Sequence, residues 1–477
     1  MKKLKLFLEN MVIYGIGGVI NKLIPLLMVP LVTALMPDSA YFGLSDMSNM
    51  LINLAYSLSL MGMYDAMYRM FFEKEDETYK KTVCSTALAA TFTTSAVIAV
   101  LIVLLRRAVA ELFFTGTQYT YLVYLCAVAT IVYAVNHIVI APTRMQNKGR
   151  LYILVNVLGP TLSYAISIPL ILKGYYTIAL TLAGLISTAT LVFSFGMLNR
   201  KWFSFRRVDK SMLKQMLLLA LPLPNPLLYW VFNFSSKLII NSLLGLSVAG
   251  VYAVSSKLGQ VSQLIYTAFA GGWQYFAFST MHEENQVQSN SRIYEYLGTI
   301  ACCVTAFVFA CSGWIFRILF PDAYYEGYLA APYLFFAPLL QMLYQVAVNQ
   351  FLVIRRTWPN ILILSAGALA NVVLGFVLVP VLGIEGAAIA TLLGYLLTNV
   401  ICVLVLLRWK LMVISPRFLL LSGAMVGFVL TWRLLAVEKT GLGVALALLL
   451  NALALLLYYK DLAALVGMVF AKLRKKK

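Results

Sequence analysis

Six charged side chains lie within runs of otherwise apolar sequence, and their types suit the binding of a charged ligand. The set comprises four cations and two acids: Lys22, Arg69, Lys237, Lys257, Asp46 and Asp65. If these runs lie in a lipid bilayer, each charge near its centre costs about 2.5 to 3.5 kcal/mol unless it meets water or a partner. The excess of cations predicts a wet cavity that favours an anion. The two acids are candidate ion-coupling residues.

Simpler hypotheses remain open for several of these residues. Arg69 lies near the end of its apolar run, where a long side chain can reach the interface. Asp65 precedes it by four residues, so the two could form only an ion pair on one helix face. Asp46 is close enough to a run's end to be solvated. Lys22 lies about 16 Å into its run at 1.5 Å per residue, which makes reaching the interface difficult.

Polar, uncharged side chains flank these charges on the same four runs. They are Asn21, Asn49, Asn53, Asn233, Ser235, Ser236, Ser255, Ser256, Gln260 and Gln263. Amides and hydroxyls both donate and accept hydrogen bonds, so they keep a helix face wet. The first, second, seventh and eighth runs, which carry both the charged and the polar residues, are therefore expected to line the cavity.

The composition indicates which elements must position these residues. Hydrophobic residues make up 62% of the chain and charged residues 12%, whereas soluble domains have about half and a quarter. The apolar runs reach the roughly 20 residues that a helix needs to cross a bilayer. They show no alternation with a period of two, so helices rather than a barrel satisfy the backbone amides in lipid. The sequence predicts an all-α, polytopic membrane helix bundle.

Polar breaks divide the sequence into about fourteen predicted spans. They lie near 11–36, 41–69, 83–105, 117–141, 151–172, 176–199, 214–239, 248–278, 294–319, 328–354, 358–381, 384–407, 417–437 and 441–459. Of the 37 Lys and Arg residues, 27 fall on one side of this map and six on the other. Positive residues stay on the cytoplasmic side, so both termini are predicted to be cytoplasmic. The net charge of +19 is thus assigned to topology and membrane lipids, with no nucleic-acid partner.

An internal repeat suggests how the spans are grouped. The segment around Gly174 aligns loosely with that around Gly383, and "AYFGLSDMSNMLINL" with "VAGVYAVSSKLGQVSQL", which places Gly43 over Gly250. The offset covers six spans, an even number, so the two copies have the same orientation and a cavity between them is expected. The predicted divisions are a six-helix lobe over 1–210, a second over 211–412, and two further spans with a basic cytoplasmic tail over 413–477.

Other residue types give no sign of a cofactor or a metal site. All six cysteines fall in apolar segments and are predicted to pack, and only two histidines occur. A Walker-type loop is missing from the sequence, so no ATPase activity is expected of this chain. Glu385, between two glycines, is predicted to be a solvated acid in a turn, and residues 73–77 a solvated connection.

Three segments carry a resemblance to a known family. They are "PDSAYFGLSDMSNMLINLAYSLSLMGMYDAMYR", "SSKLIINSLLGLSVAGVYAVSSKLGQVSQLIYTAFAGGWQYFAFS" and "NVVLGFVLVPVLGIEGAAIATLLGYLLTNVI". Together they resemble the polysaccharide-biosynthesis or oligosaccharide flippases of the MATE-like multidrug/oligosaccharidyl-lipid/polysaccharide superfamily, over nearly the whole chain. The resemblance implies two six-helix lobes and the export of undecaprenyl-pyrophosphate-linked sugars across the bacterial cytoplasmic membrane. Other proteins of polysaccharide assembly are then expected partners.

The resemblance also bears on single residues. Family members often carry an acid before a base in the seventh span, where this chain has Ser236 and Lys237, so ion coupling at that place is in doubt. Related lipid II flippases place cations in the first, second and eighth spans, which Lys22, Arg69 and Lys257 would fill.

Three functions remain as hypotheses. The favoured one is a flippase that exports an anionic polyprenyl-pyrophosphate-linked oligosaccharide by alternating access. A cation-coupled multidrug exporter of the MATE type would need a mainly acidic or aromatic cavity, which the lysine and arginine surplus disfavours. A membrane glycan polymerase or ligase would need a large outer loop, and the predicted outer breaks are short.

Overall fold

A computed structural model describes residues 22–146, 148–220, 225–279, 284–354, 356 and 358–474. Throughout these ranges the secondary structure is helical, without a strand, which confirms the predicted all-α class. Eight helices are long and apolar enough to cross a membrane, and two shorter apolar helices cover Lys22–Leu35 and Val157–Leu172. α2 and α11, which carry many of the polar residues singled out from sequence, are not among these eight described helices. Both helices carry polar residues that line the cavities described below, and these residues lower the mean hydropathy of the two helices.

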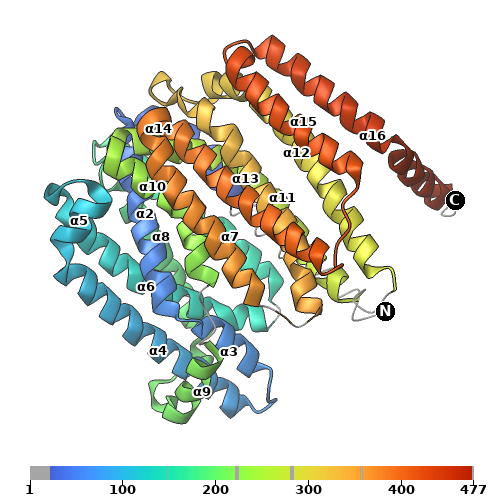
Figure 1. The fold of residues 1–477 in the computed structure, drawn as a ribbon. Coiled ribbons are helices and arrows are strands. Elements are labelled where there is room, and N and C mark those ends of the chain that lie inside the picture. Colours follow the sequence, from blue (N-terminus) through green and yellow to red (C-terminus); the bar gives the residue numbers. More distant parts are fainter. Residues whose placement is uncertain are drawn as a thin grey trace.

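The helices of the first half follow one another along the chain and pack together, on the left and bottom of Figure 1. After the first helix, Lys22–Leu35, the bounds are α2 Ser39–Leu60, α3 Met63–Phe71, α4 Glu77–Leu104, α5 Arg106–Phe114, α6 Thr120–Met145, α7 Gly149–Leu172, α8 Ala179–Leu198 and α9 Lys210–Ala220. Single-turn 3₁₀ segments cover Thr117–Tyr119, Arg200–Trp202 and Phe205–Arg207.

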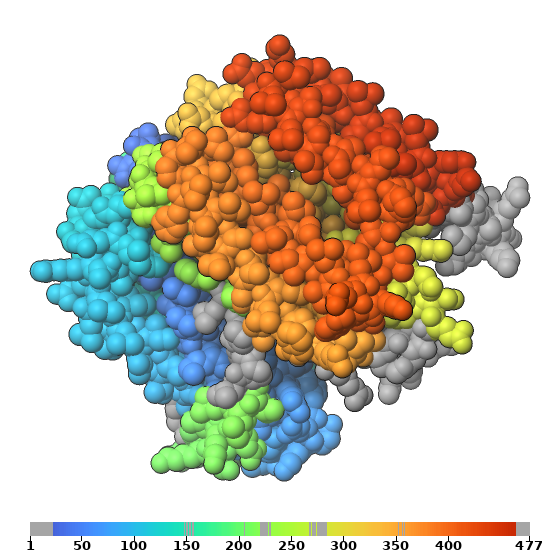
Figure 2. All heavy atoms as spheres, viewed as in Figure 1, coloured from blue at the N-terminus to red at the C-terminus, as the bar shows by residue number. Residues whose placement is uncertain are grey.

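The second half forms the other side of the molecule. Its bounds are α10 Asn225–Leu244, α11 Leu246–Ser279, α12 Gln286–Leu319, α13 Gly327–Val353, α14 Trp358–Arg408, α15 Pro416–Thr431, a π-helical turn Trp432–Ala436 and α16 Thr440–Arg474, with a 3₁₀ turn at Asp322–Tyr324. α15 and α16 pack on α12, away from the first half. In Figure 2 these red helices lie across the molecule from the cyan α4 to α6.

Local signals fix several helix ends. Asp38 caps α2 by accepting from the Ala40 amide at 2.7 Å, and Asp76 caps α4 by accepting from the amides of Thr78 and Tyr79. The connection at residues 73–77, expected to be merely solvated, therefore also starts a helix. α14 holds two predicted spans, which turn at Gly383, whose φ of 59° and ψ of −135° only glycine adopts readily.

Two predicted spans differ from the observed helices. The second is interrupted where Met61 and Gly62 take positive φ, so α3 starts anew at Met63. The seventh was predicted from residue 214, but α9 is a separate helix and the spanning segment is α10. Pro226, the second residue of α10, suits the start of a helix, because proline lacks the amide hydrogen that a helix interior needs. The last helix, α16, extends to Arg474, into the predicted tail.

The two halves meet through α2 and α11. Gly43 and Gly250, which the repeat superposes, lie against each other's backbones: a Cβ on Gly250 would come within 2.0 Å of the Ser39 carbonyl oxygen. Ser39 Oγ also donates to the Ser247 carbonyl oxygen at 3.0 Å. We call this contact the α2–α11 crossing. The exact lobe boundaries stay a prediction.

Candidate functional site

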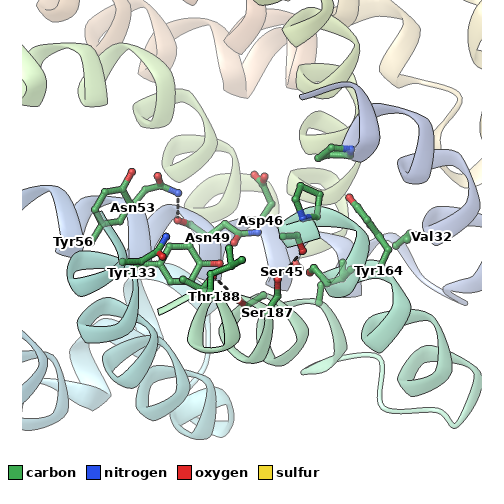
Figure 3. A pocket seen from close by; sticks show the side chains of 18 of the residues that line it. Val32, Ser45, Asp46, Asn49, Asn53, Tyr56, Tyr133, Tyr164, Ser187 and Thr188 are labelled. Carbon is green, nitrogen blue, oxygen red and sulfur yellow. Dashed lines mark hydrogen bonds between the residues drawn. The ribbon is translucent and has the colours of Figure 1, made fainter. Parts of the chain in front are cut away.

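A cavity of about 440 Å³ lies among the helices of the first half. Polar residues from α2, α6, α7 and α8 line much of it (Figure 3): Ser45, Asp46, Asn49, Asn53, Tyr56, Tyr133, Asn136, His137, Ser163, Tyr164, Ser187 and Thr188. Its volume lies within the range of about 300 to 1,000 Å³ that ligand pockets occupy. One cation reaches it from the second half, Lys257 of α11. We call it the first cavity.

A second cavity, of about 370 Å³, lies among α10, α11, α13 and α14. Its lining includes Asn233, Lys237, Tyr252, Ser256, Gln260, Gln263, Gln341, Thr391 and Tyr395. Here too one cation comes from the opposite half, because Lys22 of the first helix lines it. Each half of the molecule thus holds a cavity into which the other half, or the first helix, contributes a lysine.

The two cavities follow the internal repeat. A shift of 207 residues, which places Gly43 on Gly250, also places Asn49, Asn53 and Tyr56 of the first cavity on residues of the second. Their counterparts are Ser256, Gln260 and Gln263. Side chains at i, i+4 and i+7 lie on one helix face, so both copies present the same wet face to their own cavity. A single cavity between the halves was predicted, whereas the described residues enclose a cavity within each half; we call the two cavities chambers.

An ion pair joins the two halves where the chambers meet. Lys237 of α10 lines the second cavity and donates to Asp46 Oδ2 of α2, which lines the first, at 2.6 Å. Both side chains are only 7% exposed. Two charges removed from water are costly unless they are paired, so this contact offsets the cost of burying both side chains. Lys237 and Asp46, predicted separately as a ligand for an anion and an ion-coupling acid, are thus brought together.

Lys22 and Lys257 lie on either side of a narrow gap between the chambers. Both line a void of about 10 Å³ together with Pro25, Leu26 and Gln260. The charges that act on Lys257 are Asp46, which attracts it, and Lys237, which repels it. Three predicted cations and one acid therefore gather at the junction of the chambers, with a surplus of positive charge.

The other two predicted site residues lie elsewhere. Asp65 and Arg69 are on α3, both exposed, and neither lines the two cavities as the described residues define them. No ion pair joins them in the described part of the chain, although they share a helix face. The break at Met61 and Gly62 separates this short helix from the cavity-lining face of α2.

The prediction for Glu385 is wrong, because this residue is buried rather than solvated. Its side chain is 3% exposed and accepts from Arg433 Nε at 2.6 Å and from the Tyr333 hydroxyl at 3.2 Å. Arg433 lies in the π-helical turn that follows α15, so this pair ties the C-terminal helices to α14 and α13. The sequence around Glu385 contains no signal that α15 and the turn after it would cover this residue.

A second polar network at the opposite end of α15 was not foreseen. Glu295 of α12 is 4% exposed and accepts from Ser415 N at 2.6 Å and Ser415 Oγ at 2.7 Å. Nearby, Arg417 forms an ion pair with Asp461 of α16. These contacts anchor the last two helices, and they lie apart from the two cavities. Among the described residues no group of three or more His, Cys, Asp or Glu could hold a metal ion.

Comparisons with solved structures show a shared fold. A lipid II flippase, MurJ, in an inward closed conformation superposes with a TM-score of 0.72 at 12% identity, over 95% of this chain and 100% of that chain. An inward-facing multidrug resistance MATE family transporter of the MOP superfamily gives 0.64 at 17% identity, over 82% and 94%. A MOP superfamily transporter from Pyrococcus furiosus, described as having a binding pocket of reverse polarity, gives 0.57 at 17%, over 85% and 95%.

Comparison with curated protein sequences gives no match. A family model, described as polysaccharide biosynthesis protein, matches residues 35–329. The matched segment includes α2, whose polar face lines the first cavity, and α10 and α11, which carry Lys237 and Lys257. It covers more than half of the chain. The chain therefore belongs to the polysaccharide biosynthesis protein family.

Proposed function

We propose that this protein is a flippase that exports an anionic, polyprenyl-pyrophosphate-linked oligosaccharide across the bacterial cytoplasmic membrane by alternating access. The observation that carries the proposal is the junction between the two cavities. Lys22, Lys237 and Lys257 gather there with Asp46 as their acidic neighbour. A cluster of buried cations is costly by itself, and an anionic headgroup entering between them would offset that cost.

The sugars of such a substrate match the polar side chains that line the two chambers. Sugars carry many hydroxyls, which amide and hydroxyl side chains of both chambers can bind without any change of charge. The polyprenyl tail needs no polar site and would stay in lipid. The protein forms no covalent bond in this mechanism, so we do not propose an enzyme. Spontaneous passage of the charged headgroup is slow for the same reason that a buried charge is costly.

The Asp46–Lys237 pair gives the proposal a mechanical step. Asp46 is on the first half and Lys237 on the second, so the pair holds the halves together beside the α2–α11 crossing. A pyrophosphate that binds Lys237 competes with Asp46 for it. When Asp46 is displaced, the inter-half attraction weakens and the crossing can open. Substrate binding is thereby coupled to the conformational change, as alternating access requires.

The charge map sets the direction of transport. Because the side with 27 Lys and Arg residues is assigned to the cytoplasm, the α2–α11 crossing falls on the outer side. The structure then corresponds to a state closed toward the outside. An inside-negative potential of 100 mV favours the outward passage of two negative charges by about 4.6 kcal/mol. Reporter fusions near Lys210 and at the C-terminus should report the cytoplasm, and an external C-terminus would contradict this orientation.

A MATE-type multidrug exporter remains the alternative, since transporters of that kind share the fold. Such an exporter needs a free acid to attract cationic drugs. Asp46, the acid that lines the first cavity, is already paired with Lys237 at 2.6 Å. The arrangement therefore supports an anionic substrate better than a cationic one.

The test is export of surface polysaccharide by a deletion strain that carries each variant, with membrane abundance measured in parallel. Lys22→Glu combined with Lys257→Glu should abolish export while leaving insertion intact, because repulsion replaces attraction at the junction. Lys22→Arg should retain part of the activity. The matched control is Lys173→Glu, since Lys173 is exposed in the turn between α7 and α8. Normal export by the double variant would refute the proposal.

A further inference from the structure

Aromatic side chains of α2, α3 and α6 form a continuous row that starts inside the first cavity. Tyr56 lies beside Tyr133, with ring centroids 6.3 Å apart, and stacks on His137 at 5.2 Å with planes 20° apart. Figure 3 shows Tyr56 and Tyr133 together at one end of this cavity, next to Asn53. The imidazole of His137 then meets the ring of Tyr64 edge-on at 6.3 Å. The row thus leaves the cavity along α3.

The row continues to the end of the bundle at which α3 ends. Tyr64 and Tyr68 lie 6.2 Å apart, and Tyr68 and Phe72 lie 5.6 Å apart. These rings are not core residues. Tyr64 and Tyr68 are half-buried, and Phe72 is 58% exposed. Tyr64 and Tyr68 each pack one side against the core cluster around Met67 and Phe71, and the rest of their surface stays accessible along the way from the cavity to the molecular surface.

Hydrogen-bonding groups accompany the row where it lines the cavity. Asn53 and Asn136 flank Tyr56 and Tyr133 in the lining. The side-chain oxygen of Asn136 is buried and has no hydrogen-bond partner among the described residues. Because a buried polar atom without a partner is unfavourable, this oxygen is available to a ligand hydroxyl or amide. Flat apolar faces beside amides are the combination that suits a ring with apolar faces and a polar rim.

The second cavity has rings of its own, among them Phe232 and Tyr395, whose centroids lie 4.3 Å apart, but they occupy other places. The repeat sets Gln263 opposite Tyr56. The same shift of 207 residues sets Leu340 opposite Tyr133 and Tyr344 opposite His137, and neither of these residues lines the second cavity. The repeat therefore does not copy the lining rings Tyr56, Tyr133 and His137 into the second cavity.

We propose that the row formed by Tyr133, Tyr56, His137, Tyr64, Tyr68 and Phe72 binds the pyranose rings of the glycan and leads them into the first cavity. This inference rests on the proposed function and assigns separate binding places to the sugars and to the pyrophosphate. The apolar C–H face of a pyranose packs on an aromatic face, while its hydroxyls bond to tyrosine and asparagine side chains. The pyrophosphate lies at the lysine junction, and the sugars lie on the aromatic row. Stacking of this kind tolerates different sugars, because it uses ring faces rather than particular hydroxyl positions.

The experiment measures binding of two neutral trisaccharides, maltotriose and chitotriose, and of inorganic pyrophosphate to the purified full-length protein by saturation-transfer NMR. Tyr56→Ala and Tyr64→Ala should weaken trisaccharide binding about tenfold and leave pyrophosphate binding unchanged. Tyr56→Phe and Tyr64→Phe keep the ring and should stay within about twofold of the unaltered protein. The control is Tyr124→Ala, because Tyr124 is 44% exposed on α6 and does not line the first cavity.

The outcomes separate this inference from the proposed function. Lys257→Ala should weaken pyrophosphate binding alone. If pyrophosphate does not bind while trisaccharides bind through Tyr56 and Tyr64, the flippase proposal fails and the aromatic row stands. If Tyr56→Ala and Tyr64→Ala bind trisaccharides as well as the unaltered protein, or no more weakly than Tyr124→Ala, the inference is overturned. Absence of trisaccharide binding by the unaltered protein overturns it too. Gel filtration and melting curves of each variant check that the fold is kept.

Discussion

Removing one charge of the Asp46–Lys237 pair should lower the free energy of unfolding far more than removing both charges. At 2.6 Å and an effective dielectric constant of 20, the Coulomb attraction is about 6 kcal/mol before desolvation is counted. Truncating one partner of a buried pair costs about 3 to 5 kcal/mol, because the other charge stays buried without compensation. Replacing both partners by uncharged residues of similar size is often close to neutral. Since each single variant loses about 3 to 5 kcal/mol and the double variant almost none, a double-mutant cycle should give a coupling energy of about 6 to 10 kcal/mol.

The cycle uses Asp46→Asn, Lys237→Met and the double variant, unfolded by SDS in mixed micelles and followed by tryptophan fluorescence. The control cycle uses Glu77→Gln and Lys81→Met, whose charges are 2.8 Å apart on α4 but partly exposed. An exposed pair four residues apart contributes about 0.3 to 0.5 kcal/mol. A coupling for the buried pair no larger than that of the control would refute the reasoning.

The same variants should change the conformational equilibrium. Losing about 3 kcal/mol of attraction between the halves would shift the closed-to-open ratio about 100-fold toward the open state. A cysteine at position 39, in the α2–α11 crossing, reports this opening, since Ser39 is 7% exposed in the closed state. Labelling of Ser39→Cys by an impermeant maleimide added outside should rise strongly in the Asp46→Asn background. Unchanged labelling would show that the pair does not hold the crossing closed.

Two further predictions concern the packing around the cavities. Gly250→Ala should severely lower membrane abundance and the melting temperature, because its Cβ would lie 2.0 Å from a backbone oxygen of α2. The control Gly423→Ala, whose Cβ would have no atom within 4 Å, should keep the melting temperature of the unaltered protein. Arg433→Ala should lower the melting temperature by leaving Glu385 buried without its ion-pair partner, and Glu385→Gln in the same chain should restore part of the loss; equal melting temperatures of the single and double variants would contradict this account.

The helical class of the fold followed from sequence because lipid leaves few choices. A backbone without water must be helical, and the length of an apolar run is then set by the bilayer. The repeat set Gly43 over Gly250, and the structure shows in addition that these two positions pack against each other. The error at α9 has an identifiable cause: hydropathy alone extended the run through the prolines before α10.

The composition of the site could be predicted, but its pairing could not. Lys237 and Asp46 were each singled out as costly charges, yet they are 191 residues apart in the chain. Their contact depends on how the two halves pack, which no local pattern encodes. The same limit explains Glu385, whose burial results from a helix that follows 48 residues later. The aromatic row has a local signal, since Tyr56, Tyr64 and Tyr68 recur at helical spacing, but its link through His137 of α6 requires the fold.

The pairing also suggests which anions the site would respond to. Asp46 offers Lys237 one negative charge at 2.6 Å, without any loss of translational freedom on binding. A ligand with a single charge would have to match that contact and also overcome the entropy of association. A pyrophosphate diester brings two charges, so it can bind Lys237 and also engage Lys22 or Lys257 across the junction. In the proposed mechanism, Asp46 occupies Lys237 while the substrate is absent and so keeps the halves together. Release of the halves would then require a ligand with more charge than one carboxylate, and such a site would distinguish a lipid pyrophosphate from abundant monoanions whatever glycan it carries.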